Sequence, residues 1–239
     1  MRSKSRNLFH FTPKLEFLES ILENGFYPRF CLEDASTLDY YKQDFIAYPM
    51  VCFCDIPLSK INEHTLFYGS YGIGLKRSWG NKNRLAPVIY SSVDSPINDL
   101  ARSLVKKMLI DNPDGLQEEV DAKNLLSLIK PIEGKMIIDN KEVLKEFYLE
   151  NEWRFVPNNL SAIPKNSFSA LRDQGNKELE STEPLKFTID DIQYVFLKEE
   201  KEIPHMVDKL STIFSSEPPS ALKLLFTKII CLETLLSDI

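Results

Sequence analysis

The stretch from Phe67 to Gly80, FYGSYGIGLKRSWG, has the most distinctive composition in this 239-residue chain. Residues 68–74 of this stretch contain three glycines together with Tyr68 and Tyr71, although the whole chain has only 8 glycines. Glycine allows a close backbone approach or a positive φ, and tyrosine offers a flat apolar face and a hydroxyl. The stretch therefore fits either the wall of a site for a planar ligand or an ordinary bulged strand with buried tyrosines.

A second stretch lies near the N-terminus, where Phe9, His10, Phe11 and Thr12 form an apolar run with one histidine. A lone histidine in such a strand is most often hydrogen-bonded in a core, but it also suits donation to a ligand hydroxyl or phosphate. Thr12 precedes Pro13, a pair that predicts a helix N-cap and first helical residue, so Thr12 would cap the helix and contact the same ligand.

A third stretch, ENEWRF, begins at Glu150. If a strand has begun by Glu150, the side chains of Glu150, Glu152 and Arg154 share one face of the sheet. One carboxylate would then stabilise a cation that develops on a ribose, or act as a general base. The alternative is a structural network of paired charges, and the short motif alone does not decide between the two.

Composition limits the classes of protein. The net charge of -6 gives no support for general attraction to nucleic acid or to an anionic membrane, although a local basic patch is compatible with it. No apolar window is long enough to span a membrane. The four cysteines form no disulfide framework and no CxxC pair, and Cys52 and Cys54 fit reduced core thiols without metal. A cytoplasmic protein is expected.

The order of predicted elements indicates an α+β fold with a mixed or antiparallel sheet of short strands and helices at the C-terminal end. We expect one domain, residues 1–239, with a helical insertion at 95–130 that begins at Ser95-Pro96. Residues 161–183 are polar and predict a loop. The apolar stripe in 221–236 predicts one closing helix.

The run from Phe45 to Tyr90, FIAYPMVCFCDIPLSKINEHTLFYGSYGIGLKRSWGNKNRLAPVIY, resembles the hallmark segment of the AbiGi family. LFHFT from Leu8 and LESILENGFYPRF from Leu18 are similar to the opening of that family. ENEWRFVP, from Glu150, resembles the E-x-E-[WY]-R element of related DUF2971-type proteins. AbiGi proteins are bacterial abortive-infection proteins, described as antitoxins of phage-resistance systems. The resemblance implies a phage-defence component that binds a toxin protein.

A looser resemblance is to ADP-ribosyltransferases, which combine an H-x-T strand, a tyrosine-rich strand and a later ExE strand. It implies NAD as cofactor, with His10 at the ribose and Tyr68 or Tyr71 stacked on the nicotinamide. It further implies Glu152 at the cationic transition state, with Glu150 activating the acceptor, while Arg154 shares their strand. The chain departs from that pattern, because it has no clear serine-threonine-serine strand and only Arg6 near the first strand.

The sequence is therefore compatible with two functions. The first is a non-catalytic antitoxin that binds a toxin partner, or nucleic acid, in a bacterial cytoplasm. The second is an enzyme or binding protein for NAD or a nucleotide that uses His10, Tyr71 and Glu152. If the second holds, these three side chains line one pocket.

Overall fold

The computed structural model describes residues 6–38, 44–111, 116–138, 141–158 and 161–237. It divides into two compact units. Unit 1 comprises Met1–Phe26, Phe53–Arg84 and Pro184–Ile239, and unit 2 comprises Tyr27–Cys52 and Leu85–Glu183. The chain changes unit at four points, after Phe26, Cys52, Arg84 and Glu183, and the second of these lies within the strand β3 (Phe45–Cys54).

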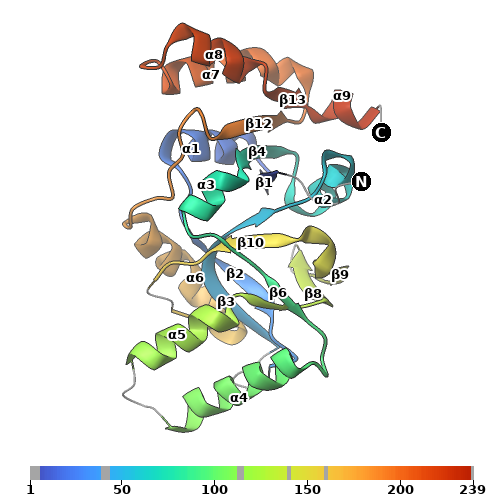
Figure 1. Ribbon diagram of the computed structural model, residues 1–239, viewed down its shortest axis with the longest axis vertical. Coiled ribbons are helices and arrows are strands. Elements are labelled where there is room, and N and C mark those ends of the chain that lie inside the picture. The colour runs from blue at the N-terminus through green and yellow to red at the C-terminus, as the bar shows by residue number, and fades with distance from the viewer. Residues whose placement is uncertain (1–5, 39–43, 112–115, 139–140, 159–160, 238–239) are drawn as a thin grey trace. The chain divides into compact units, whose positions relative to one another are not determined.

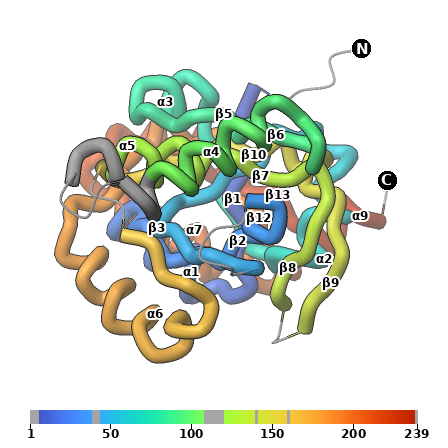
Figure 2. Tube along the Cα trace, turned by 90° about the horizontal axis from the view of Figure 1, so that it is seen from below, coloured from blue at the N-terminus to red at the C-terminus, as the bar shows by residue number. Residues whose placement is uncertain are grey.

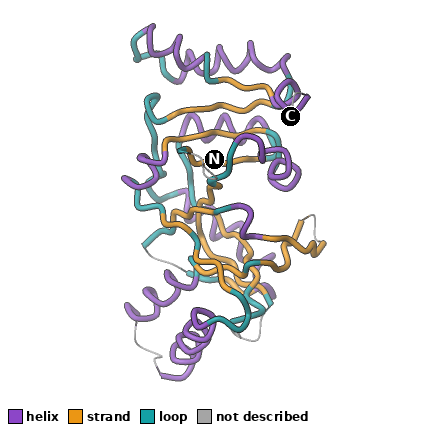
Figure 3. The backbone as a smooth tube through the Cα atoms, turned by 45° about the vertical axis from the view of Figure 1, so that its right-hand side comes forward, coloured by secondary structure: helices purple, strands orange, loops and turns teal. Residues whose placement is uncertain are grey.

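Four strands lie side by side in unit 1, in the order β13-β12-β4-β1 (Figure 3). Their bounds are β1 Asn7–Thr12, β4 Tyr71–Lys76, β12 Ile192–Leu197 and β13 Ile229–Cys231. β12 and β13 are parallel, whereas β4 is antiparallel to both of its neighbours. The predicted strand in the glycine-rich stretch is therefore confirmed as β4, in the middle of this set.

The glycines of β4 leave room for aromatic rings of the protein itself. A Cβ on Gly72 would lie 2.6 Å from the Phe11 ring, and a Cβ on Gly74 would lie 2.9 Å from the rings of Phe9 and Tyr194. Any larger residue would force these rings away from the strand. The alternation of glycine along β4 thus has a packing cause, as in the ordinary-strand alternative stated above. The buried tyrosines of that alternative are wrong, because Tyr71 is half-buried and Tyr68 ends the helix Ile61–Tyr68.

Helices accompany these strands. Their bounds are α1 Leu15–Asn24, α2 Ile61–Tyr68, α3 Arg77–Lys82, α7 Ile203–Ile213, α8 Pro219–Phe226 and α9 Leu232–Ser237, with short 3₁₀ turns at Leu58–Lys60 and Glu200–Glu202. The predicted cap at Thr12 is wrong, because Thr12 ends β1 and Lys14 occupies the N-cap position of α1 without a side-chain cap. The predicted single helix over 221–236 is also wrong, since β13 separates α8 from α9 to pair with β12.

Unit 2 is built on β3, which pairs antiparallel with β2 and β11 and lies next to β10. The strand bounds in this unit are β2 Arg29–Asp34, β5 Ala86–Pro87, β6 Ile89–Ser91, β7 Ile129–Pro131, β8 Glu133–Ile138, β9 Lys141–Glu146, β10 Glu152–Phe155 and β11 Ile163–Pro164. β8 and β9 form a separate antiparallel hairpin and run side by side in Figure 2. A 3₁₀ turn, η3 (Phe147–Glu150), joins β9 to β10.

The predicted helices at 95–130 form as α4 (Pro96–Asp111) and α5 (Leu116–Leu126), between the parallel strands β6 and β7. Their buried faces share one apolar cluster with β3, which contains Ala101, Val105, Leu126, Ile46 and Met50. The helices therefore supply part of the core of unit 2.

The predicted loop at 161–183 is wrong, because residues Lys165–Glu180 form the helix α6. α6 contacts β2 and β11, and its Phe168 and Leu179 pack against a cluster that includes Phe30 and Ile163. A few apolar side chains on one face are enough to hold a helix whose sequence is otherwise polar.

The predicted α+β class is confirmed, with mostly antiparallel pairing and helices that do not alternate regularly with strands (Figure 1). The assignment of residues 1–239 to a single domain stays a prediction.

We expect Leu126→Ala to lower the free energy of unfolding by about 2–5 kcal/mol, because it empties a buried position in the cluster shared with β3. Leu125 is the matched control, since it is the preceding residue of α5 but its side chain is 45% exposed against 1% for Leu126. Leu125→Ala should change the free energy of unfolding by less than about 0.5 kcal/mol. Equal effects in urea denaturation would show that α5 does not belong to the core.

Candidate functional site

A network of buried charges forms the most concentrated group of titratable side chains in the described part of unit 2. It contains three carboxylates and three cations, which are Glu33, Glu150, Glu152, Lys130, Lys145 and Arg154. Each of these side chains is at most 12% exposed. The formal charges cancel, as burial of so many ionic groups requires.

Arg154 lies at the centre of the network, and its guanidinium is fully buried. Its Nε donates to Glu152 Oε1 at 2.8 Å, and its Nη2 donates to Glu152 Oε2 at 3.1 Å and to Glu33 Oε2 at 2.6 Å. Nη1 donates to the carbonyl oxygen of Ser127 at 2.5 Å. The planar fork of arginine suits this arrangement of two carboxylates and a carbonyl.

Lys130 connects the remaining groups. Its Nζ lies 2.8 Å from Glu152 Oε2, 3.4 Å from Glu150 Oε2 and 3.6 Å from Glu33 Oε2. The ammonium also lies 4.3 Å from the centre of the Phe147 ring, a cation–π contact. Three carboxylates therefore share one lysine.

The network closes at its edge through Lys145 and Tyr90. Lys145 Nζ lies 2.5 Å from Glu150 Oε1. The Tyr90 hydroxyl accepts a hydrogen bond from the backbone N–H of Glu152 at 2.8 Å. Burial and the nearby charge of Glu152 raise the pKa of Tyr90, so its hydroxyl stays protonated at neutral pH.

The charges inside the network determine its protonation. Burial by itself would raise the pKa of Glu152. The positive charges of Arg154 and Lys130 have the larger effect and hold this pKa well below the ordinary range. Burial acts in the same direction on Glu150, and there too the attraction of Lys130 lowers the pKa. Burial lowers the pKa of Lys145, against the attraction of Glu150. Both carboxylates are ionised at neutral pH, which suits paired ions rather than a proton donor.

The backbone brings Glu150 and Glu152 together differently from the sequence prediction. Glu150 belongs to η3 rather than to a strand, and Asn151 follows with φ 43° before β10 begins at Glu152. Asparagine adopts this left-handed conformation more readily than most residues. The predicted shared face of Glu152 and Arg154 is confirmed, because both are buried while Trp153 and Phe155 are half-buried.

His10 and Thr12 lie in unit 1, on β1. The half-buried His10 ring packs edge-on against Phe26, with 5.2 Å between the ring centres, and lies 5.6 Å from Phe53. Thr12 is buried at the end of the strand, next to the backbone of Gly69. These contacts place His10 among aromatic side chains of unit 1.

Tyr68 and Tyr71 also lie in unit 1. The Tyr68 ring lies 4.5 Å from the His64 ring, within α2. The Tyr71 hydroxyl donates to Glu202 Oε1 at 2.7 Å. Burial and this hydrogen bond raise the pKa of Tyr71 to about 12. Both tyrosines are thus in contact with side chains of unit 1.

The predicted site residues fall into two groups. The structure brings Glu150, Glu152 and Arg154 together in unit 2, while the histidine, threonine and tyrosines belong to unit 1. A common pocket for His10, Tyr71 and Glu152 stays a prediction.

Cys52 and Cys54 both lie on β3, and all four cysteines are free thiols. In the described ranges, no group of three histidine, cysteine or acidic side chains is arranged to hold a metal ion. The absence of metal from the protein stays a prediction.

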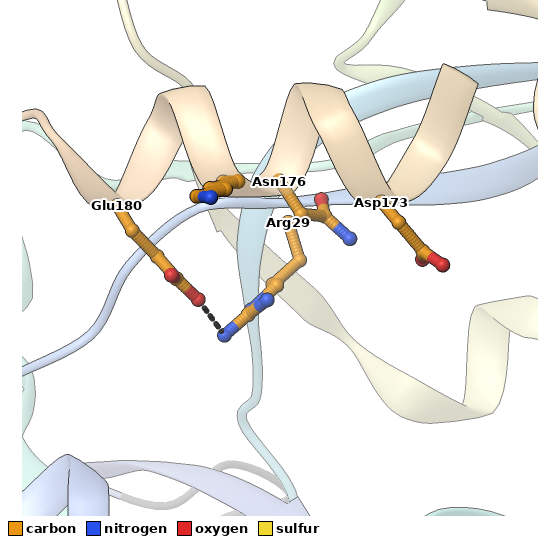
Figure 4. A pocket seen from close by; sticks show the side chains of 5 residues that line it. Arg29, Asp173, Asn176 and Glu180 are labelled. Atoms are coloured by element: carbon orange, nitrogen blue, oxygen red, sulfur yellow. Dashed lines mark hydrogen bonds and ion pairs between the residues drawn. The ribbon is translucent and has the colours of Figure 1, made fainter.

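A surface pocket in unit 2 lies between β2 and α6 (Figure 4). It is lined by Arg29, Asp173, Asn176, Lys177 and Glu180, and Arg29 Nη2 lies 2.7 Å from Glu180 Oε1. Both side chains of this ion pair are about half exposed. Solvent screens such a pair, so it contributes little to stability.

Sequence reasoning missed four members of the site: Glu33, Lys130, Lys145 and Tyr90. Lys130 from β7 and Lys145 from β9 pair with the glutamates of the ExE motif, and Glu33 from β2 pairs with Arg154. None of the three has a characteristic spacing to the motif in the chain. The sequence contains one sign that Lys130 is buried, because Lys130 stands between Ile129 and Pro131 in an apolar run.

The chain is similar to bacterial proteins of phage resistance. A relative from Lactococcus lactis subsp. cremoris, "Abortive phage resistance protein AbiGi", is 28% identical over 210 residues, which cover 72% of this chain and 82% of the relative. The family model described as "Putative abortive phage resistance protein AbiGi, antitoxin" matches residues 24–198. This match covers most of the chain, so the chain belongs to the AbiGi family. No solved structure matches it.

The family match confirms the resemblance identified from the sequence, and it includes the whole charge network. Within the described residues, no helix has the length and apolar character needed to cross a membrane. A cytoplasmic location stays a prediction.

We expect Glu152→Gln to lower the free energy of unfolding by about 3–5 kcal/mol, because it leaves three buried cations facing two carboxylates. Glu146→Gln is the matched control, since Glu146 is an exposed glutamate of the same segment. It should change the free energy of unfolding by less than about 0.5 kcal/mol. Urea denaturation measures both, and equal stability of the two variants would contradict a structural role for the network.

Acid should destabilise the protein through the same carboxylates. The pKa values of Glu150 and Glu152 are lowered in the folded state, so the unfolded chain binds protons first as the pH falls. The stability that these groups confer is present above the ordinary glutamate pKa of about 4.3 and is lost below it. Urea midpoints at about pH 7 and about pH 3.5 should differ less for Glu152→Gln than for the wild type. Parallel pH profiles would show that Glu152 does not contribute.

Proposed function

We propose that this chain is the antitoxin of an abortive-infection system and that it acts by binding a toxin protein. The observation that carries the proposal is the internal pairing of the ExE-x-R motif, combined with a family described as an antitoxin. The two carboxylate oxygens of Glu152 are held by Arg154 and Lys130, which gives this side chain a structural role. A function in binding a toxin does not require Glu152 to contact a ligand.

The geometry gives less support to the enzyme alternative. Glu152 would have to exchange its contacts with Arg154 and Lys130 for a developing cation on the substrate. The Tyr71 hydroxyl is bonded to Glu202, and aromatic rings of unit 1 fill the space above Gly72 and Gly74. An ADP-ribosyltransferase-like enzyme that uses His10, Tyr71 and Glu152 with NAD stays a prediction.

Co-expression with the toxin gene of the same phage-resistance locus tests the proposal. We expect the toxin alone to stop growth of a bacterial host, and the wild-type chain to restore colony formation and to elute with the purified toxin in gel filtration. Growth arrest that persists while both proteins are present at normal levels would refute antitoxin function.

The same purified protein tests the enzyme alternative. Wild-type protein is incubated with NAD, and released nicotinamide is measured by chromatography against a buffer blank. We expect no release above the blank. Release that Glu146→Gln retains and Glu152→Gln abolishes would replace the binding proposal with the enzymatic one.

A further inference from the structure

An exposed apolar and acidic surface lies on the β8–β9 hairpin and the turn η3 that follows it. We call this surface the hairpin patch and define it by Ile132, Glu133, Leu144, Glu146, Tyr148 and Leu149. All six residues are exposed. The two segments that carry these residues lie side by side. Glu133 is paired with Glu146, and the backbone N–H of Tyr148 donates to the carbonyl oxygen of Ile132 at 3.1 Å.

The register of the hairpin separates this face from the buried network. Glu133 lies opposite Glu146 and Lys135 lies opposite Leu144, so these four side chains share one face of the hairpin. Lys145 points to the other face, where it pairs with Glu150 inside the network. The network thus holds the inner face of the hairpin and leaves the outer face to solvent.

The patch concentrates large apolar side chains outside the core. Leu144 is 79% exposed, Tyr148 is 62% exposed and Leu149 is 60% exposed, with Ile132 beside them. A single exposed leucine needs no explanation, but several on one short segment mark a surface that another molecule covers. Tyrosine is enriched at the centre of protein interfaces, and the leucines beside Tyr148 add apolar area to the same surface.

Glu133 and Glu146 indicate that a molecule covering the hairpin patch carries positive charge. Glu133 and Glu146 lie directly opposite each other across the two strands, an arrangement in which like charges repel. Neither forms an ion pair with any residue that the structure describes. A cation from a partner would relieve this repulsion, and the net charge of -6 of the whole chain attracts a basic partner over longer distances.

We propose that the hairpin patch is the docking surface for a basic face of the toxin protein, on which lysine or arginine side chains flank apolar ones. This inference rests on the proposed function and adds to it the surface and the chemistry of the partner. The cations meet Glu133 and Glu146, while apolar groups cover Leu144, Tyr148 and Leu149. The negative charge of the patch disfavours nucleic acid at this surface.

Two surface variants and two matched controls test the proposal, with the purified toxin of the same locus as the probe. Glu146→Lys reverses a charge in the patch and Glu183→Lys reverses an exposed charge outside it. Leu144→Ser removes an exposed leucine from the patch and Leu224→Ser removes one from α8, where Leu224 is 64% exposed. Because all four side chains are exposed, each variant should keep the wild-type melting temperature, which circular dichroism verifies.

Isothermal titration calorimetry then measures the dissociation constant of each complex. We expect Glu146→Lys and Leu144→Ser to weaken toxin binding by at least about tenfold and both controls to stay within about twofold. Raising the salt concentration from about 0.1 M to about 0.5 M should weaken wild-type binding more than binding by Glu146→Lys, because salt screens the charge pairs.

The outcomes separate this inference from the function on which it rests. Wild-type protein that neither binds nor neutralises the toxin would overturn the proposed function and the docking surface together. Wild-type binding that all four variants retain would overturn the docking surface alone. Self-association of the wild type that Leu144→Ser abolishes, with toxin binding unchanged, would assign the patch to a second copy of this chain and also overturn the proposal.

Discussion

The buried guanidinium of Arg154 is the constraint on which unit 2 depends. A cation without solvent must be paired, and Arg154 reaches that state only when Glu152, Glu33 and the carbonyl oxygen of Ser127 all surround it. Those carboxylates then require Lys130, and Glu150 requires Lys145 as well. Five elements, β2, β7, β9, η3 and β10, must therefore meet in one arrangement.

Such a network contributes more to the choice of one structure than to stability. Burying the ions costs free energy that their mutual attraction only offsets, whereas any displaced element would leave an unpaired charge in the interior. The α4–α5 crossover illustrates the consequence, because the chain must return along β7 to place Lys130 beside Glu152. The hairpin is held in the same way by Lys145, and its outer face stays free to carry a different function.

Unit 1 is organised by a different interaction, the packing of aromatic rings over glycines. Phe9, Phe11 and Tyr194 from the two strands beside β4 occupy the space that side chains at Gly72 and Gly74 would need. Glycine in a strand costs conformational entropy, and here ring packing compensates for it. The same sequence feature would also suit a ligand site, so the stretch alone left both explanations open.

The sequence by itself determined the α+β class, the strands at β4 and β10, the helix α4 and the common face of Glu152 and Arg154. Each of these follows from a local property, such as residue alternation, a Ser-Pro helix start or apolar spacing. The tertiary structure alone decided that residues 165–180 form a helix, that β13 interrupts the C-terminal helical stretch and that Glu33, Lys130 and Lys145 pair with the motif. These features depend on contacts between residues far apart in the chain, and no local periodicity records which distant charge will neutralise a buried one.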